Sequence, residues 1–164
     1  MKIYLKGDIK LVRGFEIVED KFRKNPDCKI IMPQRGTSKS AGYDICTPVD
    51  IVIPAKGHSS TIFTDIKAYM LPDEVLCTHV RSSIGMKRGL VLANTTGIID
   101  SDYYSNQDND GNIGFMLRNL TDEEVVIKAG ERVIQGIFSK YLVADGDEPK
   151  SEERVGGVGS TGRK

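Results

Sequence analysis

Short apolar runs rich in valine and isoleucine recur along this chain, and they constrain its fold more than any other feature. Each run is shorter than an ordinary helix, and several alternate apolar and polar residues with the period of two that a strand requires. The runs cover 29–32, 51–53, 60–66, 75–80, 89–92, 113–117, 125–127 and 133–138, with turn-forming residues at 54–57, 71–73, 109–111 and 128–130. Many short strands at close spacing predict an all-β sandwich or jelly roll.

The rest of the chain predicts one domain followed by a tail. With 164 residues, a single β domain over 1–143 is the expectation, including an N-terminal extension over 1–28. Charged residues at 15–25 predict a short helix within that extension. Residues 144–153 are acidic and poor in apolar side chains, which predicts a linker, and the glycine-rich 154–164 predicts a mobile C-terminal arm.

Charge and cysteine content narrow the class of function. The 23 basic and 23 acidic residues cancel, so we expect neither nucleic acid nor a membrane as a partner. Cys28, Cys46 and Cys77 are far apart and have no metal-ligand spacing with His58 or His79. Reduced thiols, together with the lack of a signal-peptide pattern at the start of this sequence, predict a cytoplasmic protein.

The segment 97–103 reads Gly-Ile-Ile-Asp-Ser-Asp-Tyr and places two carboxylates and a phenol at the mouth of a predicted β-hairpin that begins near Leu92. A carboxylate in that position can orient and deprotonate a water molecule. The alternative is an ordinary turn in which aspartate and serine cap backbone groups.

Two further segments suit phosphate oxygens. Arg81, Ser82 and Ser83 combine a planar bidentate donor with two hydroxyls, although a solvated strand end is the alternative. The C-terminal 154–162 offers a guanidinium, hydroxyls and many backbone amides, with a disordered tail as the alternative. It lacks the Gly-Lys-Ser/Thr ending of a P-loop, which excludes a P-loop NTPase.

Five segments, in this order, resemble the ordered motifs of the trimeric dUTPase family. They are Ala-Gly-Tyr-Asp-Ile at 41–45, Arg-Ser-Ser at 81–83, the segment 97–103, Gly-Glu-Arg-Val-Ile-Gln at 130–135 and the glycine-rich 154–162. The resemblance extends from about residue 29 to the C-terminus. It implies a jelly-roll subunit of the β-clip kind and a homotrimer with active sites shared between chains and closed by the C-terminal arm. It also implies a dUTP diphosphatase, which hydrolyses dUTP to dUMP and pyrophosphate.

The same resemblance implies a role for individual residues. Asp100 would activate the water that attacks the α-phosphate, and Tyr103 would stack beneath the deoxyribose. Asp44 would hold Mg²⁺ through water, unless it is only a turn aspartate. Arg132 would make a structural ion pair. The remaining implied substrate-binding residues are Asn94, Gly97 and Ile99 for uracil, Arg81, Ser82, Ser83 and Gln135 for the phosphates, and Arg154, Gly159, Ser160 and Thr161 from the arm.

The sequence departs from the family pattern in three places. The extension before residue 29 has no functional account. An insertion at 104–110 predicts a hairpin extension or flexible loop, with a possible regulatory protein partner. Val158 stands where the family usually has an aromatic residue that stacks on uracil. Phe115 and then Tyr104 are the candidates to replace that ring, with core packing as the alternative for Phe115.

Two other functions stay open beside the hydrolase. A dCTP deaminase of the same fold would carry a catalytic glutamate on the base-binding hairpin, where Thr95, Thr96 and Gly97 offer none. A regulatory module that senses dUTP would bind nucleotide without turning it over. The presence of Asp100 favours catalysis.

Overall fold

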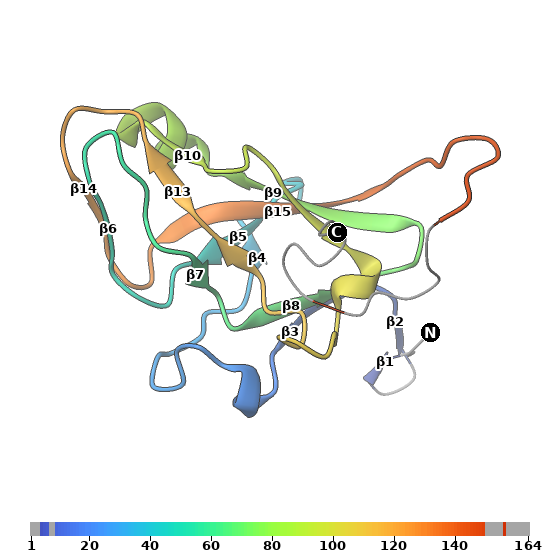
Figure 1. The fold of residues 1–164 in the computed structure, drawn as a ribbon. Helices are drawn as coiled ribbons and strands as arrows, with labels where there is room; N and C mark the ends of the chain where they lie inside the picture. Colours follow the sequence, from blue (N-terminus) through green and yellow to red (C-terminus); the bar gives the residue numbers. More distant parts are fainter. Residues whose placement is uncertain (1–3, 7–8, 150–155, 157–164) are drawn as a thin grey trace.

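The structure is a computed structural model that describes residues 4–6, 9–149 and 156 (Figure 1). Almost all of its regular structure is β, which confirms the predicted fold class. The strands are β1 (Tyr4–Lys6), β2 (Ile9–Leu11), β3 (Gly14–Ile17), β4 (Gln34–Arg35), β5 (Tyr43–Cys46), β6 (Ile51–Ile53), β7 (Ile62–Phe63), β8 (Ile66–Tyr69), β9 (Glu74–Val80), β10 (Leu90–Leu92), β11 (Gly97–Asp100), β12 (Gly114–Phe115), β13 (Leu117–Asn119), β14 (Val125–Ile127) and β15 (Arg132–Lys140). Short helical turns lie at η1 (Asp20–Phe22), η2 (Ser83–Lys87) and η3 (Ser101–Tyr103).

An antiparallel five-stranded sheet, in the order β11-β9-β15-β5-β4, is the largest unit. Its long central strands β9 and β15 cross the middle of the molecule in Figure 1. The other strands form two-stranded sheets, which pair β10 with β13, β7 with β12, β6 with β14, β3 with β8 and β1 with β2.

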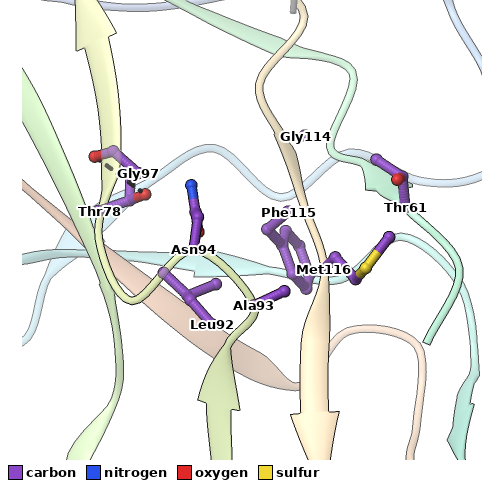
Figure 2. Close-up of a pocket in the computed structure, with 9 residues that line it drawn as sticks. All are labelled: Thr61, Thr78, Leu92, Ala93, Asn94, Gly97, Gly114, Phe115 and Met116. Atoms are coloured by element: carbon purple, nitrogen blue, oxygen red, sulfur yellow. Dashed lines mark hydrogen bonds between the residues drawn. The ribbon is translucent and has the colours of Figure 1, made fainter. Parts of the chain in front are cut away.

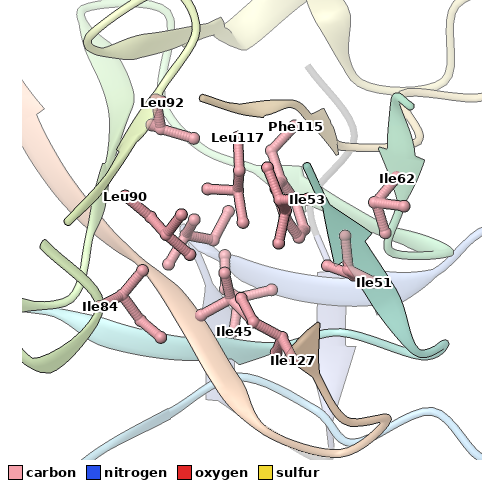
Figure 3. Packing of buried hydrophobic residues seen from close by; sticks show 12 residues of the cluster. Ile45, Ile51, Ile53, Ile62, Ile84, Leu90, Leu92, Phe115, Leu117 and Ile127 are labelled. Carbon is pink, nitrogen blue, oxygen red and sulfur yellow. The ribbon is translucent and has the colours of Figure 1, made fainter. Parts of the chain in front are cut away.

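The main hydrophobic core joins the five-stranded sheet to three of these small sheets (Figure 3). Ile45 of β5 and Ile134 of β15 are fully buried in it, and they meet residues from the pairs β6–β14, β7–β12 and β10–β13. Successive side chains of a strand point to opposite faces, so Asp44, Gln135 and Asp100 lie on the face of the large sheet that points away from this core.

The N-terminal extension contributes a strand where the sequence predicted a helix. Residues 14–17 form β3, which pairs with β8, and only Asp20–Phe22 is helical. The ring of Phe15 packs 5.3 Å from that of Tyr43 and 5.3 Å from that of Phe138. The helix prediction is wrong because this long-range pairing and ring packing override the local pattern.

Several strand boundaries also differ from the prediction. No strand forms at 29–32, and the run 60–66 is broken by Asp65, whose φ is 59°. The buried carboxylate of Asp65 accepts hydrogen bonds from the backbone N–H groups of Lys24 and Asn25, both at 2.8 Å. The break therefore anchors the N-terminal extension. Residues 144–149, the described part of the predicted linker, are exposed and contain no strand. None of the helices in the described ranges has the length and apolar character to cross a membrane.

Candidate active site

A pocket of about 170 Å³ opens where the chain passes from β10 to β11, which belong to different sheets (Figure 2). These consecutive strands do not form the predicted hairpin, because β10 pairs with β13 while β11 pairs with β9. The loop 93–96 thus crosses from one sheet to another, and the gap between the sheets becomes the pocket. It is lined by Thr61, Thr78, Leu92, Ala93, Asn94, Gly97, Gly114, Phe115 and Met116.

The backbone at this pocket is held in place while one of its edges stays available. Thr95 N–H donates to the Leu92 carbonyl at 2.9 Å, and Thr96 N–H donates to the Asn94 carbonyl at 2.7 Å. Within the described residues β11 is an edge strand of the five-stranded sheet, so one row of its backbone N–H and C=O groups has no ladder partner. Gly97 is required here, because a Cβ at that position would overlap Thr78 Oγ1.

Asp100 ends β11 opposite Val75, and its side chain is exposed. The chain then turns through η3 and brings Tyr103 inward, where it is only 5% exposed. The Tyr103 hydroxyl donates to the Asn112 carbonyl at 3.1 Å and accepts from Asn109 Nδ2 at 2.7 Å. The phenol therefore has a fixed position close to the catalytic candidate.

The insertion 104–110 is a compact loop without strands, so the predicted hairpin extension is wrong and the loop alternative describes it. Asn106 is buried, and its side chain bonds to the Tyr103 carbonyl, to Asn109 Oδ1 and to two backbone N–H groups at 2.8–3.1 Å. Asp110 is 2% exposed and pairs with Lys67 at 2.8 Å. Side-chain amides satisfy the backbone groups that a strand ladder would otherwise have to satisfy.

Both candidates for a stacking lid are held by contacts within the subunit. Phe115 is 5% exposed and belongs to the main core, so the alternative of core packing is confirmed for it. The Tyr104 hydroxyl donates to Glu16 Oε2 at 2.6 Å, and its ring lies 6.2 Å from that of Tyr69. Val158 lies outside the described residues.

A second group of site candidates surrounds the carboxylate of Asp44. Its Oδ1 accepts from Arg81 Nε at 2.7 Å, and its Oδ2 accepts from Arg132 Nη1 at 3.1 Å, which confirms the structural ion pair predicted for Arg132. A bulge in β15 makes this possible. Because Arg132 pairs with Cys46 while Gln135 pairs with Asp44, the irregularity between them turns Arg132 to the same face as Gln135.

The side chain of Gln135 reaches across this group. Its Nε2 donates to the Val80 carbonyl at 3.4 Å, and a Cβ at Gly42 would come within 2.5 Å of its Oε1. The glycine of the first motif thus leaves the space that the glutamine of the fourth motif occupies.

A pocket of about 350 Å³ beside Arg81 adds two cations that the sequence analysis missed. Lys87 is the last residue of η2, the turn that starts at Ser83, and Arg88 follows it. Arg88 Nη2 pairs with Glu131 at 2.6 Å. The Lys128 backbone N–H and the Arg88 guanidinium lower the pKa of Glu131. The sequence feature that could have indicated Lys87 and Arg88 is their position a few residues after the Arg-Ser-Ser motif. Ser82 is exposed and Ser83 is half-buried.

The structure does not bring Asp100 and Arg81 of one chain together. Asp100 lies opposite Val75 near one end of β9, whereas Arg81 directly follows the other end of that strand. Val75 and Arg81 are six residues apart in the sequence, which is about 20 Å in an extended strand. Asp100 is thus far from Arg81 in one chain, although Gly97 lies opposite Thr78, only three residues from Arg81. We call Asn94, Gly97, Ile99, Asp100 and Tyr103 the nucleoside group, and Asp44, Arg81, Ser82, Ser83, Arg132 and Gln135 the phosphate-binding group.

The arm candidates Arg154, Gly159, Ser160 and Thr161 lie outside the described residues. Gly156, which is described, is buried. Within the described ranges, no three His, Cys, Asp or Glu side chains gather in a way that could hold a metal ion.

Comparisons with known proteins identify relatives of this chain. The dUTPase family matches residues 28–162. The deoxyuridine 5'-triphosphate nucleotidohydrolase of Lactococcus lactis is 52% identical over 152 residues, covering 92% of this chain and 98% of that protein. The crystal structure of the Streptococcus mutans dUTPase is 43% identical, with a TM-score of 0.70 over 81% of this chain and 99% of that one. A dUTPase variant from phage phi11 of S. aureus, described with a structural Mg(II) ion, has a TM-score of 0.65 over 88% of this chain and 100% of that one. At 19% identity, that likeness shows the fold alone.

Proposed function

The chain belongs to the dUTPase family and is a dUTP diphosphatase that hydrolyses dUTP to dUMP, and from this premise we propose that each active site is shared between copies of the chain. The observation that carries the proposal is the separation of Asp100 from Arg81 by about 20 Å along β9. Asp100 acts at the α-phosphate, and a triphosphate is too short to run from there to Arg81 of the same chain. A second copy of the chain must therefore supply the phosphate-binding group of residues. A closed homotrimer provides this arrangement at three equivalent sites.

The pocket beside the loop 93–96 receives the uracil base. The edge of β11 that has no strand partner within the described residues offers backbone donors and acceptors in fixed positions, including those of Gly97 and Ile99. The Asn94 side chain adds an amide (Figure 2). Uracil matches this fixed polarity, while cytosine would leave buried polar groups unpaired. Recognition by fixed backbone polarity explains why the pocket is lined by small and apolar side chains.

Tyr103 excludes ribonucleotides. Its ring lies under the deoxyribose and leaves no room for a 2′-hydroxyl. The burial of the ring and the two hydrogen bonds of its hydroxyl support this role, because a gate must not yield to a larger sugar.

Asp100 orients the attacking water and accepts its proton. The water oxygen forms a bond to the α-phosphorus as the bond to the bridging oxygen breaks, and the bonding electrons leave with pyrophosphate. Placement of Asp100 at the exposed end of β11 supports this role, since the water and the phosphate must reach it from outside the subunit.

The phosphate-binding group holds the triphosphate of dUTP through Arg81, Ser82, Ser83 and Gln135. Two guanidiniums, those of Arg81 and Arg132, share the one carboxylate of Asp44, so these residues carry an excess of positive charge. Arg154, Gly159, Ser160 and Thr161 of the arm close over the far phosphates.

The donor set fits a magnesium ion held mainly by substrate phosphates and water. Each Asp44 oxygen accepts one N–H from an arginine and keeps a lone pair for a water ligand of the ion. A bound Mg²⁺ would supply positive charge to offset that of the substrate phosphates. Asp44 contributes by holding Arg81 and by accepting from such a water.

The other two functions are less favoured. The loop 93–96 has no carboxylate side chain of the kind that a dCTP deaminase needs. A regulatory protein partner at 104–110 would meet a loop whose Asn106 and Asp110 face inward. One domain over 1–143 and a cytoplasmic location complete the proposal.

A pyrophosphate-release assay tests the proposed substrate recognition. With dUTP, dCTP, dTTP and UTP at equal concentration, we expect release from dUTP alone at an appreciable rate and a strong dependence on added Mg²⁺. Comparable rates with dCTP or UTP would contradict the proposed recognition of base or sugar. Full activity in the presence of a chelator would contradict the role of the ion.

A further inference from the structure

We propose that Asn109, in the insertion 104–110, is a positioning residue that sets the discrimination between dUTP and UTP by holding the phenol of Tyr103. This inference rests on the proposed role of Tyr103 as the gate against a 2′-hydroxyl. Asn109 does not line the pocket and acts only through the tyrosine hydroxyl.

Both the oxygen and the nitrogen of the Asn109 side-chain amide form hydrogen bonds. Its Oδ1 accepts from Asn106 Nδ2 at 2.8 Å and from the Gly111 backbone N–H at 3.1 Å, which orients the amide. Its Nδ2 then points to the Tyr103 hydroxyl at 2.7 Å, while that hydroxyl donates to the Asn112 carbonyl at 3.1 Å. A hydroxyl that donates along one line and accepts along another is fixed in position.

The loop that carries Asn109 is itself anchored in the body of the subunit. Asp110, the next residue, is 2% exposed, and both of its carboxylate oxygens contact Lys67 Nζ, at 2.9 and 2.8 Å. One of these oxygens also accepts the Glu19 backbone N–H at 2.8 Å. To retreat, the loop would have to break a buried ion pair and separate from the N-terminal extension, which is costly because it strands a buried charge.

This arrangement makes the gate stiff. A ribonucleotide could be accommodated if the ring of Tyr103 moved away from the sugar. The hydrogen bonds from Asn109 and to Asn112 oppose that movement, because moving the ring would leave polar atoms without partners in a buried place. The two departures of this chain from the family pattern, the extension and the insertion, thus meet at Lys67 and Asp110 and together support the gate.

The test compares five variants by the ratio of kcat/KM for UTP to kcat/KM for dUTP. Asn109→Ser keeps a side-chain oxygen for the Gly111 N–H but is too short to reach the phenol. Tyr103→Phe removes the hydroxyl and leaves the loop untouched. We expect each to raise the ratio by about threefold to tenfold, the effect of one lost hydrogen bond, and the double variant to raise it no further than either single one. Gln107→Ala, an exposed change in the same loop, should leave the ratio unchanged.

The outcomes separate this inference from the proposed function. Tyr103→Ala, which removes the ring, should raise the ratio more than any of these variants. If it does so while Asn109→Ser or Tyr103→Phe leaves the ratio at the wild-type value, the gate exists but Asn109 does not position it. Additive effects in the double variant would also overturn the inference. If Tyr103→Ala changes nothing, the proposed gate itself fails. Thermal unfolding of each variant shows whether the loop survives, and Tyr103→Phe gives a result even if Asn109→Ser unfolds.

Discussion

The two ends of strand β9 are built by different means. At the phosphate end, charged side chains from three strand ends and loops are arranged by ion pairs, with Asp44 between Arg81 and Arg132. At the nucleoside end, where Asp100 lies opposite Val75, the phenol of Tyr103 is held by neutral groups. The base pocket beside Thr78, midway along the strand, consists of backbone, small residues and apolar surface. A phosphate chain is recognised by charged side chains, which are long and must be fixed in position by ion pairs. A base is recognised by a pattern of donors and acceptors, which backbone already holds rigidly.

The first prediction concerns the proton transfer from the attacking water to Asp100 at the nucleoside end. Asp100→Asn keeps the shape of the side chain but cannot accept a proton, so kcat should fall by about 10³-fold or more. Binding of dUTP, measured by calorimetry, should change little. Turnover close to that of the wild type would remove Asp100 from the mechanism.

A second prediction concerns the ion pairs at the phosphate end. Asp44→Asn leaves Arg81 and Arg132 without their shared carboxylate, and kcat/KM for dUTP should fall by about 10-fold to 100-fold. The matched control is Asp50→Asn, since Asp50 pairs with Lys128 on the exposed surface at 2.7 Å. The control should stay within about twofold of the wild type. Equal losses in the two variants would show that Asp44 has no special role.

A third prediction tests whether the base pocket depends on backbone position. Gly97→Ala places a methyl group against Thr78 Oγ1, so β11 must shift and KM for dUTP should rise about tenfold. Removing the obstacle in Gly97→Ala/Thr78→Ala should restore most of the affinity. If the single variant binds dUTP normally, the position of this edge does not determine recognition.

A fourth prediction, of a smaller effect, is that the ion pair between Arg13 and Glu74 at the nucleoside end stabilises the folded state. Glu74 is buried at the start of β9, where Arg13 Nε donates to its Oε2 at 3.0 Å and the Leu71 backbone N–H donates to it at 3.2 Å. These bonds, that of Arg13 first, hold the pKa of Glu74 below its ordinary value. A lowered pKa stabilises the folded state above the unfolded pKa, and that stability is lost as the pH falls through the folded pKa.

Glu74→Gln should therefore lower the free energy of unfolding at neutral pH by about 1 kcal/mol, with the partial exposure of Arg13 limiting the effect. In chemical denaturation at a series of pH values, the difference from the wild type should shrink below about pH 4, as Glu74 becomes protonated in both states of the wild type. Activity at neutral pH should be unchanged. A difference that stays constant down to pH 2 would contradict the assignment.

Local patterns predicted those parts of the fold that local patterns determine. The runs 51–53 and 125–127 coincide with β6 and β14, because each is a short apolar segment bounded by turns. The helix predicted at 15–25 failed because Phe15 is placed by its pairing with β8, far away in the sequence. Asparagines in the insertion suggested flexibility, yet Asn106 fastens the loop through its own side chain.

The candidate site shows the same division. Family resemblance supplied the roles of individual residues, and those roles stay predictions until they are measured. What no local pattern could supply was the arrangement: the bulge that turns Arg132 toward Asp44, and the pair Lys67–Asp110, whose partners are 43 residues apart. The split between β10 and β11 also depends on which distant strand each one pairs with.

Mixed oligomers test the central claim, that a site takes Asp100 from one chain and Arg81 from another. Asp100→Asn and Arg81→Ala chains carrying different tags would be co-expressed, and oligomers containing both would be isolated through the two tags in turn. Each variant alone should be nearly inactive. In a mixed trimer with shared sites, one site of the three receives both native residues, so we predict about one third of the wild-type turnover. Mixed oligomers no more active than their parents would contradict the shared site.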